Sequence, residues 1–277
     1  MNAPVYPIPL TLSPSRISSF RSCPMQFRFA SIEKLPEPPQ IHLVKGNFVH
    51  RVLELLLAHE PEMRTVDAAR EAFEVARVEY EPSARFKALK LSVDAIDAFF
   101  KDSRELVNGY YRMENPRNTK VLGLELRLES DFGKFKLSGI IDRLEHDENG
   151  DLVISDYKTG KTPDARFGAN KMDNMHLYAS LCLRVRGELP KKLRLMYLKS
   201  STPIEVEVTP ESNAACEAAA IETFDQIAES CQTGVFETHR SGLCNFCAFK
   251  KWCPEFGGDE SLAQIEAPQI YPTIPRD

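Results

Sequence analysis

The stretch of residues 135–158 constrains the fold more than any other part of this 277-residue chain. Two apolar-rich segments, residues 135–144 and 152–158, flank an acidic segment that ends in Asn-Gly. Because Asn-Gly readily adopts the positive φ angles of a tight turn, the pattern predicts a β-hairpin. Residues two apart in a strand share a face, so we expect Asp156 and Lys158 to point the same way.

Charged side chains gather at one end of this predicted hairpin. Asp142 lies toward the end of the first strand, and Asp156 and Lys158 close the second. Two converging carboxylates can bind a hard divalent metal ion, and an ammonium beside them can stabilise negative charge. An Asp-x-Lys triplet alone is more often a solvent-exposed ion pair, so the metal-site hypothesis needs a further ligand.

That ligand is predicted upstream, on a helix over residues 46–59. His50 shares this helix with a stripe of apolar residues, and imidazole nitrogen is a common ligand of Mn²⁺. Glu54 follows one turn later and is a candidate to orient His50. The alternative for either residue is a surface or packed side chain without a role in a site.

Residues 121–130 predict a further strand. Leucines alternate with other residues there, which predicts one apolar face made of Leu122, Leu124, Leu126 and Leu128. Glu125 falls on the opposite face of this strand. It either faces the metal site or is a surface carboxylate.

The order of the predicted elements indicates an α/β fold, with a mixed central sheet flanked by helices. We expect one domain, residues 1–277, with an α-rich part (13–113), a sheet-containing core (120–233) and a cysteine-containing segment (234–256). Further helices are predicted over residues 13–27, 65–80, 83–113, 171–186 and 210–233, further strands over 192–198 and 204–208, a loop over 162–170, and an irregular tail from residue 254.

Composition and charge exclude some classes of protein. The chain is 43% hydrophobic and 27% charged, which is typical of a globular protein. No apolar run approaches the length of a membrane span, and the N-terminus does not resemble a signal peptide, so we expect a cytoplasmic protein that binds no membrane. The net charge of −5 argues against a protein that coats nucleic acid, but it permits a local basic groove.

The seven cysteines fall into two groups. Three lie in apolar helical patterns and are expected to be buried, namely Cys182, Cys216 and Cys231. The other four are Cys23, Cys244, Cys247 and Cys253, and the last three have the spacing C-x2-C-x5-C. In a reducing compartment this spacing predicts a metal site rather than a disulfide framework. Spacing does not separate zinc from an iron–sulfur cluster, because both accept four thiolates.

Four segments, in this order, resemble the RecB-like branch of the PD-(D/E)xK nuclease superfamily. Gly46-Asn-Phe-Val-His50-Arg-Val-Leu-Glu54 resembles its G-x-x-x-H-x-x-L-E helix, Gly139-Ile-Ile-Asp142-Arg its G-x-x-D-R strand, Asp156-Tyr-Lys158 its (D/E)-x-K strand, and Asn174-Met-His-Leu-Tyr178 its Q-x-x-x-Y helix. Asn174 departs from the family, which usually has Gln at this position.

The resemblance implies a restriction-endonuclease-like core over residues 120–233. It implies that His50, Asp142 and Asp156 ligate Mg²⁺ or Mn²⁺, and that Lys158 is catalytic together with the two aspartates. Tyr178 would contact DNA or support the site, and the shorter side chain of Asn174 leaves its own role open.

The cysteines extend the resemblance to an iron–sulfur branch. Several RecB-like nucleases, including AddB and the CRISPR-adaptation nucleases, carry one cysteine near the N-terminus and three near the C-terminus. Residues 13–24 and 244–254 are similar to those two segments. The resemblance implies a [4Fe-4S] cluster that joins the two ends of the chain, with a structural Zn²⁺ as the alternative.

In function, the resemblance implies a metal-dependent deoxyribonuclease, an exonuclease or endonuclease acting on single-stranded or free DNA ends in repair, recombination or phage DNA processing. The alternatives are a CRISPR-adaptation nuclease that trims DNA before integration and a non-catalytic DNA-binding subunit with a decayed site. No Walker A pattern occurs in the sequence, so a helicase or recombination partner would be a separate protein.

Overall fold

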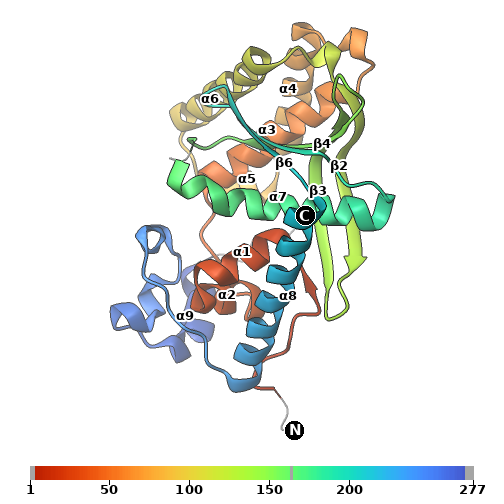
Figure 1. Ribbon diagram of the computed structural model, residues 1–277. Helices are drawn as coiled ribbons and strands as arrows, with labels where there is room; N and C mark the ends of the chain where they lie inside the picture. The colour runs from red at the N-terminus through yellow and green to blue at the C-terminus, as the bar shows by residue number, and fades with distance from the viewer. Residues whose placement is uncertain (1–3, 163–164, 272–277) are drawn as a thin grey trace. The chain divides into compact units, whose positions relative to one another are not determined.

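The computed structural model describes residues 4–162 and 165–271, with side chains in the helix of residues 165–186 described from residue 172 onward. The chain forms two compact units (Figure 1). Unit 1 comprises Met1–Pro38, Glu129–Gly139 and Ala214–Asp277, and unit 2 comprises Pro39–Leu128 and Ile140–Asn213. The expectation of one nuclease domain over the whole chain stays a prediction.

A mixed β-sheet is the framework of unit 2. Its strands are β2 (Lys120–Asp131), β3 (Lys136–His146), β4 (Leu152–Lys158), β5 (Lys192–Tyr197) and β6 (Thr202–Glu207). Residues 129–131 of β2 and 136–139 of β3 belong to unit 1. β3 pairs with β2 and runs antiparallel to β4, β4 runs parallel to β5, and β5 runs antiparallel to β6. The predicted α/β class with a mixed sheet is therefore confirmed.

The turn between β3 and β4 is the predicted hairpin turn. Gly150 has a φ angle of 83°, and its amide donates a hydrogen bond to the Asp147 carbonyl over 3.1 Å. This left-handed conformation is the one that glycine adopts without a steric penalty. The turn fixes the register in which Arg143 lies opposite Ser155.

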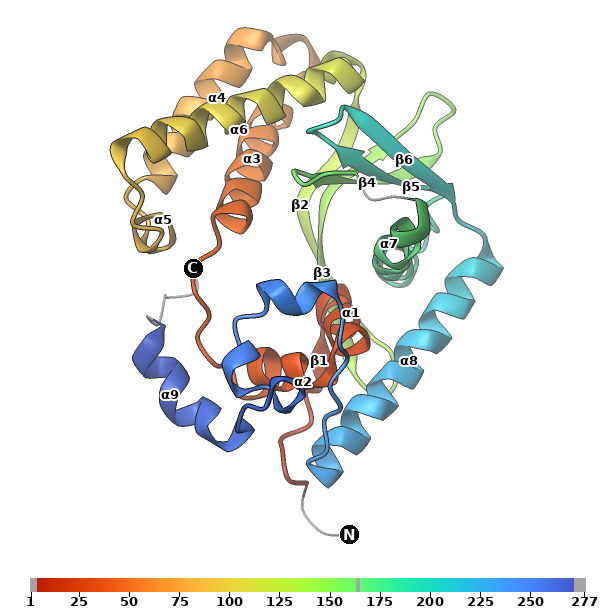
Figure 2. The ribbon, with the colours of Figure 1, turned by 90° about the vertical axis from the view of Figure 1, so that its left-hand side faces the viewer.

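Helices cover the sheet of unit 2. They are α3 (Ile41–Leu57), α4 (Val66–Tyr80), α5 (Ala84–Ala88), α6 (Val93–Met113) and α7 (Ala165–Arg186). Figure 2 shows α3 grouped with α4 and α6, and α7 contacts β4 and β5. The helix predicted over residues 83–113 is divided into α5 and α6. α3 begins earlier than the predicted residue 46, and α7 begins inside the stretch predicted to be a loop.

An aromatic cluster fills the space between these helices and the sheet. The Phe48 ring of α3 lies 5.0 Å from Phe73, 5.9 Å from Phe99 and 5.4 Å from Phe100. Tyr157 of β4 belongs to the same buried core. Aromatic side chains of this size dominate core energetics, so the cluster fixes α3 against the sheet.

The predicted face of β2 is wrong in part. Leu122 is 41% exposed, whereas Val121 and Leu124 pack against the core. Glu125 has a φ angle of 44°, a left-handed conformation that L-residues rarely adopt. This conformation breaks the strict alternation of side chains, and the strand returns to the predicted pattern at the buried Leu128.

Unit 1 contains a short strand and several helices. They are β1 (Thr11–Leu12), α1 (Pro14–Ser22), α2 (Pro24–Phe27), α8 (Pro210–Thr233) and α9 (Ala263–Ile270), with the first four residues of α8 belonging to unit 2. β1 pairs in parallel with residues 136–137 of β3. Ser13 caps α1, because its hydroxyl accepts from the Arg16 amide.

Two expectations about the C-terminal part of unit 1 need correction. The tail after residue 254 is not irregular throughout, since it forms two 3-10 turns and α9. Cys231 is buried as expected, but Cys216 is only half-buried. Across residues 4–162 and 165–271, every helix is too short or too polar to span a membrane.

Candidate functional site

Five titratable side chains of unit 2 come together, although they are far apart in sequence. α3 supplies His50, β2 supplies Glu125, β3 supplies Asp142, and β4 supplies Asp156 and Lys158. Donor atoms of His50, Glu125 and Asp142 all lie within 4.8 Å of one another. Lys158 forms an ion pair with Asp156 beside them. The left-handed backbone at Glu125 is thus located at the candidate site, where backbone strain is often found.

The backbone of Tyr157 orients two of these side chains. Its amide donates to Asp142 Oδ2 over 2.8 Å, and its carbonyl lies 2.9 Å from His50 Nε2. A carbonyl only accepts, so Nε2 carries the hydrogen. His50 Nδ1 therefore faces Asp142, 3.4 Å from its Oδ2, and when deprotonated it offers a lone pair that could bind a metal ion.

Two carboxylates in this group resist ionisation. Burial and the neighbouring Asp142 charge raise the pKa of Asp156 to about 6, against the lowering effect of Lys158. Burial and Asp142 likewise raise the pKa of Glu125 to about 7, while His50 opposes the shift. Both shifts reflect negative charges held close together away from water, an arrangement that a divalent cation would relieve.

His50 and Asp142 stabilise each other's charge. Burial alone would lower the pKa of His50, but Asp142 outweighs it and raises that pKa to about 9. Burial opposes ionisation of Asp142, yet His50 and the Tyr157 amide lower its pKa. One imidazole and several carboxylate oxygens fit Mg²⁺ or Mn²⁺, and binding through Nδ1 would displace a proton from His50.

The ammonium of Lys158 stays charged. Burial lowers its pKa, but the ion pair with Asp156 outweighs burial and raises it. The site therefore offers a fixed positive charge next to the grouped carboxylates. Such a charge is suited to stabilising an anionic oxygen.

α7 brings a phenol toward the carboxylates. Burial raises the pKa of Tyr178, and the charges of Asp156 and Asp142 raise it further. Asn174 precedes it by one helical turn, so the two side chains share a face of α7. The roles of Tyr178 and Asn174 stay predictions.

Glu54 has a different partner from the one expected. It pairs with Arg51 over 2.9 Å, and Arg51 also pairs with Glu79. The contact that orients His50 comes from the Tyr157 carbonyl instead. Sequence reasoning missed Tyr157, and its position between Asp156 and Lys158 was the one available signal.

The four cysteines with metal-site spacing lie around one small cavity in unit 1. Cys23 joins α1 to α2, and the others lie on or beside 3-10 turns of residues 242–246, 250–252 and 254–256. Cys23, Cys244, Cys247 and Cys253 all line a space of about 30 Å³. Burial raises the pKa of Cys247, and the other three thiols raise it further. The donor set fits a group that binds four thiolates.

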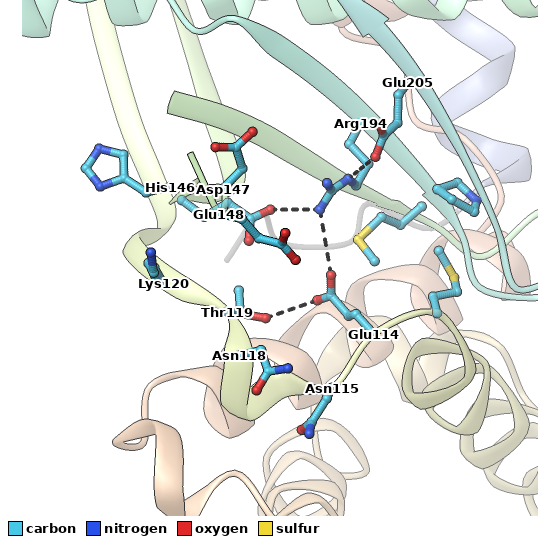
Figure 3. Close-up of a pocket in the computed structure, with 14 residues that line it drawn as sticks. Glu114, Asn115, Asn118, Thr119, Lys120, His146, Asp147, Glu148, Arg194 and Glu205 are labelled. Carbon is cyan, nitrogen blue, oxygen red and sulfur yellow. Dashed lines mark hydrogen bonds and ion pairs between the residues drawn. The ribbon is translucent and has the colours of Figure 1, made fainter. Parts of the chain in front are cut away.

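A larger cavity in unit 2 is separate from the candidate metal centre. It encloses about 540 Å³ beside the end of α6, the start of β2 and the turn after β3 (Figure 3). Arg194 donates to Glu205 over 2.6 Å there and lies 3.7 Å from Glu114. The side chains that line this cavity include none of the residues predicted to bind metal.

A mixed sheet with an imidazole, carboxylates and an ammonium gathered at one hairpin is typical of a metal-dependent nuclease core. The family model of the PD-(D/E)XK nuclease superfamily matches residues 11–254, and the chain belongs to this superfamily.

Two solved structures are similar over most of their lengths. The "Putative exonuclease" from Eubacterium rectale is 12% identical, with a TM-score of 0.53 and coverage of 86% of this chain and 87% of that one. The protein SSO0001 is 16% identical, with a TM-score of 0.44 and coverage of 89% of this chain and 86% of that one. At 12% identity the first likeness shows a shared fold. No curated protein matches the chain.

Proposed function

We propose that this protein is a divalent-metal-dependent DNA exonuclease that acts on free, single-stranded ends. The observation that carries the proposal is the gathering of His50, Glu125 and Asp142 within 4.8 Å, with the Lys158–Asp156 ion pair beside them. Membership of a nuclease superfamily supports the reaction class. The name of the Eubacterium rectale structure supports exonuclease rather than endonuclease action.

Each residue has a proposed role. His50, Asp142 and Asp156 hold Mg²⁺ or Mn²⁺, and Glu125 adds a carboxylate to the same group. When bound, the ion supplies Lewis-acid chemistry and a water of lowered pKa. Lys158 stabilises negative charge at the attacked phosphate, and Asp156 keeps the ammonium of Lys158 in place. Tyr178 supports the carboxylates or contacts the DNA strand.

Cleavage of DNA tests this proposal. End-labelled single-stranded, linear duplex and covalently closed circular DNA are incubated with the protein and Mn²⁺. We expect digestion of linear single strands and no loss of the circle. Asp142→Asn and Lys158→Ala should each lower the rate at least about a thousandfold, since both remove charge at the reacting phosphate.

Matched controls lie on exposed positions of the same unit. Asp97→Asn and Lys199→Ala make comparable changes of charge at exposed residues outside the group, and they should leave the rate unchanged. Undiminished cleavage by Asp142→Asn and Lys158→Ala would refute the assignment of this group as the active site. Loss of the circular substrate would refute exonuclease action.

For the cysteines of unit 1 we propose a [4Fe-4S] cluster. Four free thiols surround the cavity of about 30 Å³. Four thiolates bind either Zn²⁺ or a [4Fe-4S] cluster, and the resemblance of residues 13–24 and 244–254 to cluster-binding segments favours the cluster. A reducing, cytoplasmic compartment fits seven free thiols.

The identity of this group has a direct test. Protein purified without oxygen should absorb visible light and contain about four iron atoms per chain if the cluster is present. A colourless protein with one zinc per chain would show that the bound group is a structural Zn²⁺ and not the cluster. Iron and zinc both absent from wild type and from a Cys247→Ser variant would refute a metal role for these thiols.

A further inference from the structure

We propose that Tyr157, the central residue of the Asp-Tyr-Lys triplet, is a positioning residue that aligns the metal-binding groups through a hydroxyl anchored to Arg143. The inference rests on the proposed metal-dependent function. It goes beyond that function because Tyr157 ligates nothing and its side chain is 3% exposed, buried in the core.

The first step is that four functional groups depend on where the Tyr157 backbone lies. Its amide donates to Asp142, and its carbonyl accepts from His50. Asp156 and Lys158 are its direct neighbours in β4. A small shift of the backbone at this one residue would therefore change the positions of all four side chains together.

The second step is that the Tyr157 side chain is tied to a fixed point. Its hydroxyl accepts from Arg143 Nη1 over 3.0 Å. Arg143 follows Asp142 in β3, so the contact spans the two strands that carry the carboxylates. The Arg143 side chain is fully buried, and it is the charged member of this pair.

The third step is that Arg143 is itself held rigidly. Its Nη1 and Nη2 donate to the two oxygens of Glu114 over 2.5 and 3.1 Å, and Nη2 also donates to Glu145 over 2.8 Å. A planar guanidinium held by a two-pronged carboxylate contact has little freedom to rotate. Figure 3 shows Glu114 held in turn between Thr119 and Arg194.

A purely structural role for the phenol is the competing explanation, and the chain contains its own control. The Tyr110 hydroxyl accepts from the same Arg143 Nη1 over 3.3 Å, and Tyr110 is as deeply buried as Tyr157. Tyr110 lies on α6, and its carbonyl accepts from the Glu114 amide. Removing either hydroxyl takes one acceptor from Arg143, and the Tyr110 hydroxyl also hydrogen-bonds Glu114. Only Tyr157 contacts Asp142 and His50.

The experiment compares Tyr157→Phe with Tyr110→Phe. Mn²⁺ binding is measured by titration calorimetry without DNA, and folding by thermal unfolding. We expect a similar fall in unfolding temperature for both variants. Loss of a contact behind a metal ligand typically costs tenfold or more in affinity, so Tyr157→Phe should weaken Mn²⁺ binding about tenfold. Tyr110→Phe only loosens Arg143, so it should weaken Mn²⁺ binding by no more than about threefold. Cleavage by Tyr157→Phe should recover at saturating Mn²⁺.

A third variant keeps the test decisive if Tyr157→Phe does not fold. Glu114→Gln loosens Arg143 without altering a residue of the metal site, and it should weaken Mn²⁺ binding about threefold by the same route. Equal affinities in Tyr157→Phe and Tyr110→Phe, or in Glu114→Gln and wild type if only that variant folds, would overturn the positioning role. Wild type that neither binds Mn²⁺ nor cleaves would overturn the proposed function, and this inference with it.

Discussion

The two candidate metal-binding regions are built in opposite ways. In unit 2, backbone groups of β4 fix His50 and Asp142, and the strand packs on an aromatic core. In unit 1, three of the four cysteines lie on or beside 3-10 turns of three to five residues, and Phe246 between them is 82% exposed. Short 3-10 turns have poor hydrogen-bond geometry and little cooperativity.

The difference suggests different uses of a metal. A site that hydrogen bonds hold in place can take up and release an ion without refolding, which suits catalysis. A segment held mainly by short turns gains its folding energy from the group that its side chains bind, as structural metal sites do. We therefore expect unit 1 to need its bound group for folding and unit 2 to need its ion for chemistry.

The largest expected effect is on the cysteine segment. Cys247→Ser should release the bound group and expose residues 242–262 to proteases, a loss of several kcal/mol. Removing Mn²⁺ from wild type should leave the proteolysis pattern unchanged. Cys216→Ser is the control, because Cys216 does not line the cavity of the four cysteines. If Cys247→Ser is as protease-resistant as wild type, the contrast between the two regions fails.

Two glycines test the packing of each region separately. A Cβ on Gly109 would lie 1.9 Å from the Leu198 carbonyl oxygen in unit 2, and one on Gly258 would lie 2.3 Å from the Lys251 carbonyl oxygen in unit 1. Gly109→Ala should cost about 3 kcal/mol by overpacking and weaken Mn²⁺ binding. Gly258→Ala should instead lower occupancy of the cysteine site.

Gly160→Ala is the matched control for both glycines, because a Cβ there meets no atom within 4 Å. Urea unfolding, Mn²⁺ titration and metal analysis measure the three variants. If Gly109→Ala altered only the cysteine site, the expected separation between the metal-binding regions of unit 1 and unit 2 would be wrong.

The pH dependence of stability is a smaller effect, confined to unit 2. His50 has a folded-state pKa of about 9 against an ordinary value of 6.5. The folded protein thus binds this proton more tightly, and the resulting stability is complete below pH 6.5 and lost as the pH rises through 9. The pKa difference is worth at most about 3 kcal/mol, and partial exposure of the side chain brings it nearer about 2.

Urea unfolding of metal-free protein at pH 6, 7.5 and 9 measures this effect. His50→Gln should remove most of the decline with pH, and saturating Mn²⁺ should remove it in wild type by displacing the proton. An equal decline in His50→Gln and wild type would show that the Asp142–His50 pair does not cause it.

The smallest effect concerns thiol reactivity. Burial raises the pKa of Cys182 to about 12 in unit 2 and that of Cys231 to about 11 in unit 1. Since the thiolate is the reactive form, Cys182 and Cys231 should both resist alkylation at pH 8. Of these three cysteines, the half-buried Cys216 should react first. Mass spectrometry after timed iodoacetamide treatment checks the order. Rapid labelling of Cys231 would show that unit 1 opens more readily than its packing suggests.

The sequence predicted the parts of the site that depend on side-chain pattern. The alternating strand and the Asn-Gly turn bring Asp142 close to Asp156, and the apolar stripe of α3 fixes the direction of His50. The metal-binding roles themselves stay predictions. The sequence thus predicted that the side chains of His50, Asp142 and Asp156 would lie close together.

The sequence did not predict features that depend on backbone geometry. The amide and carbonyl belong to the backbone and not to the side chain. The identity of residue 157 therefore does not show that its backbone contacts both Asp142 and His50. The left-handed Glu125 is equally hidden, because glutamate seldom adopts that conformation. The early start of α7 was missed because Gly168 and Asn170 favour loops.

The conformation of Glu125 has a further consequence for β2. Among the residues that the structure describes, β2 pairs with β3 alone, and such an edge strand can be a template for the assembly of a second molecule. A left-handed residue in mid-strand costs roughly 1–2 kcal/mol and tilts the neighbouring amides out of line. The same left-handed residue that lies in the candidate metal centre thus makes this edge of the sheet a poor template for fibril growth.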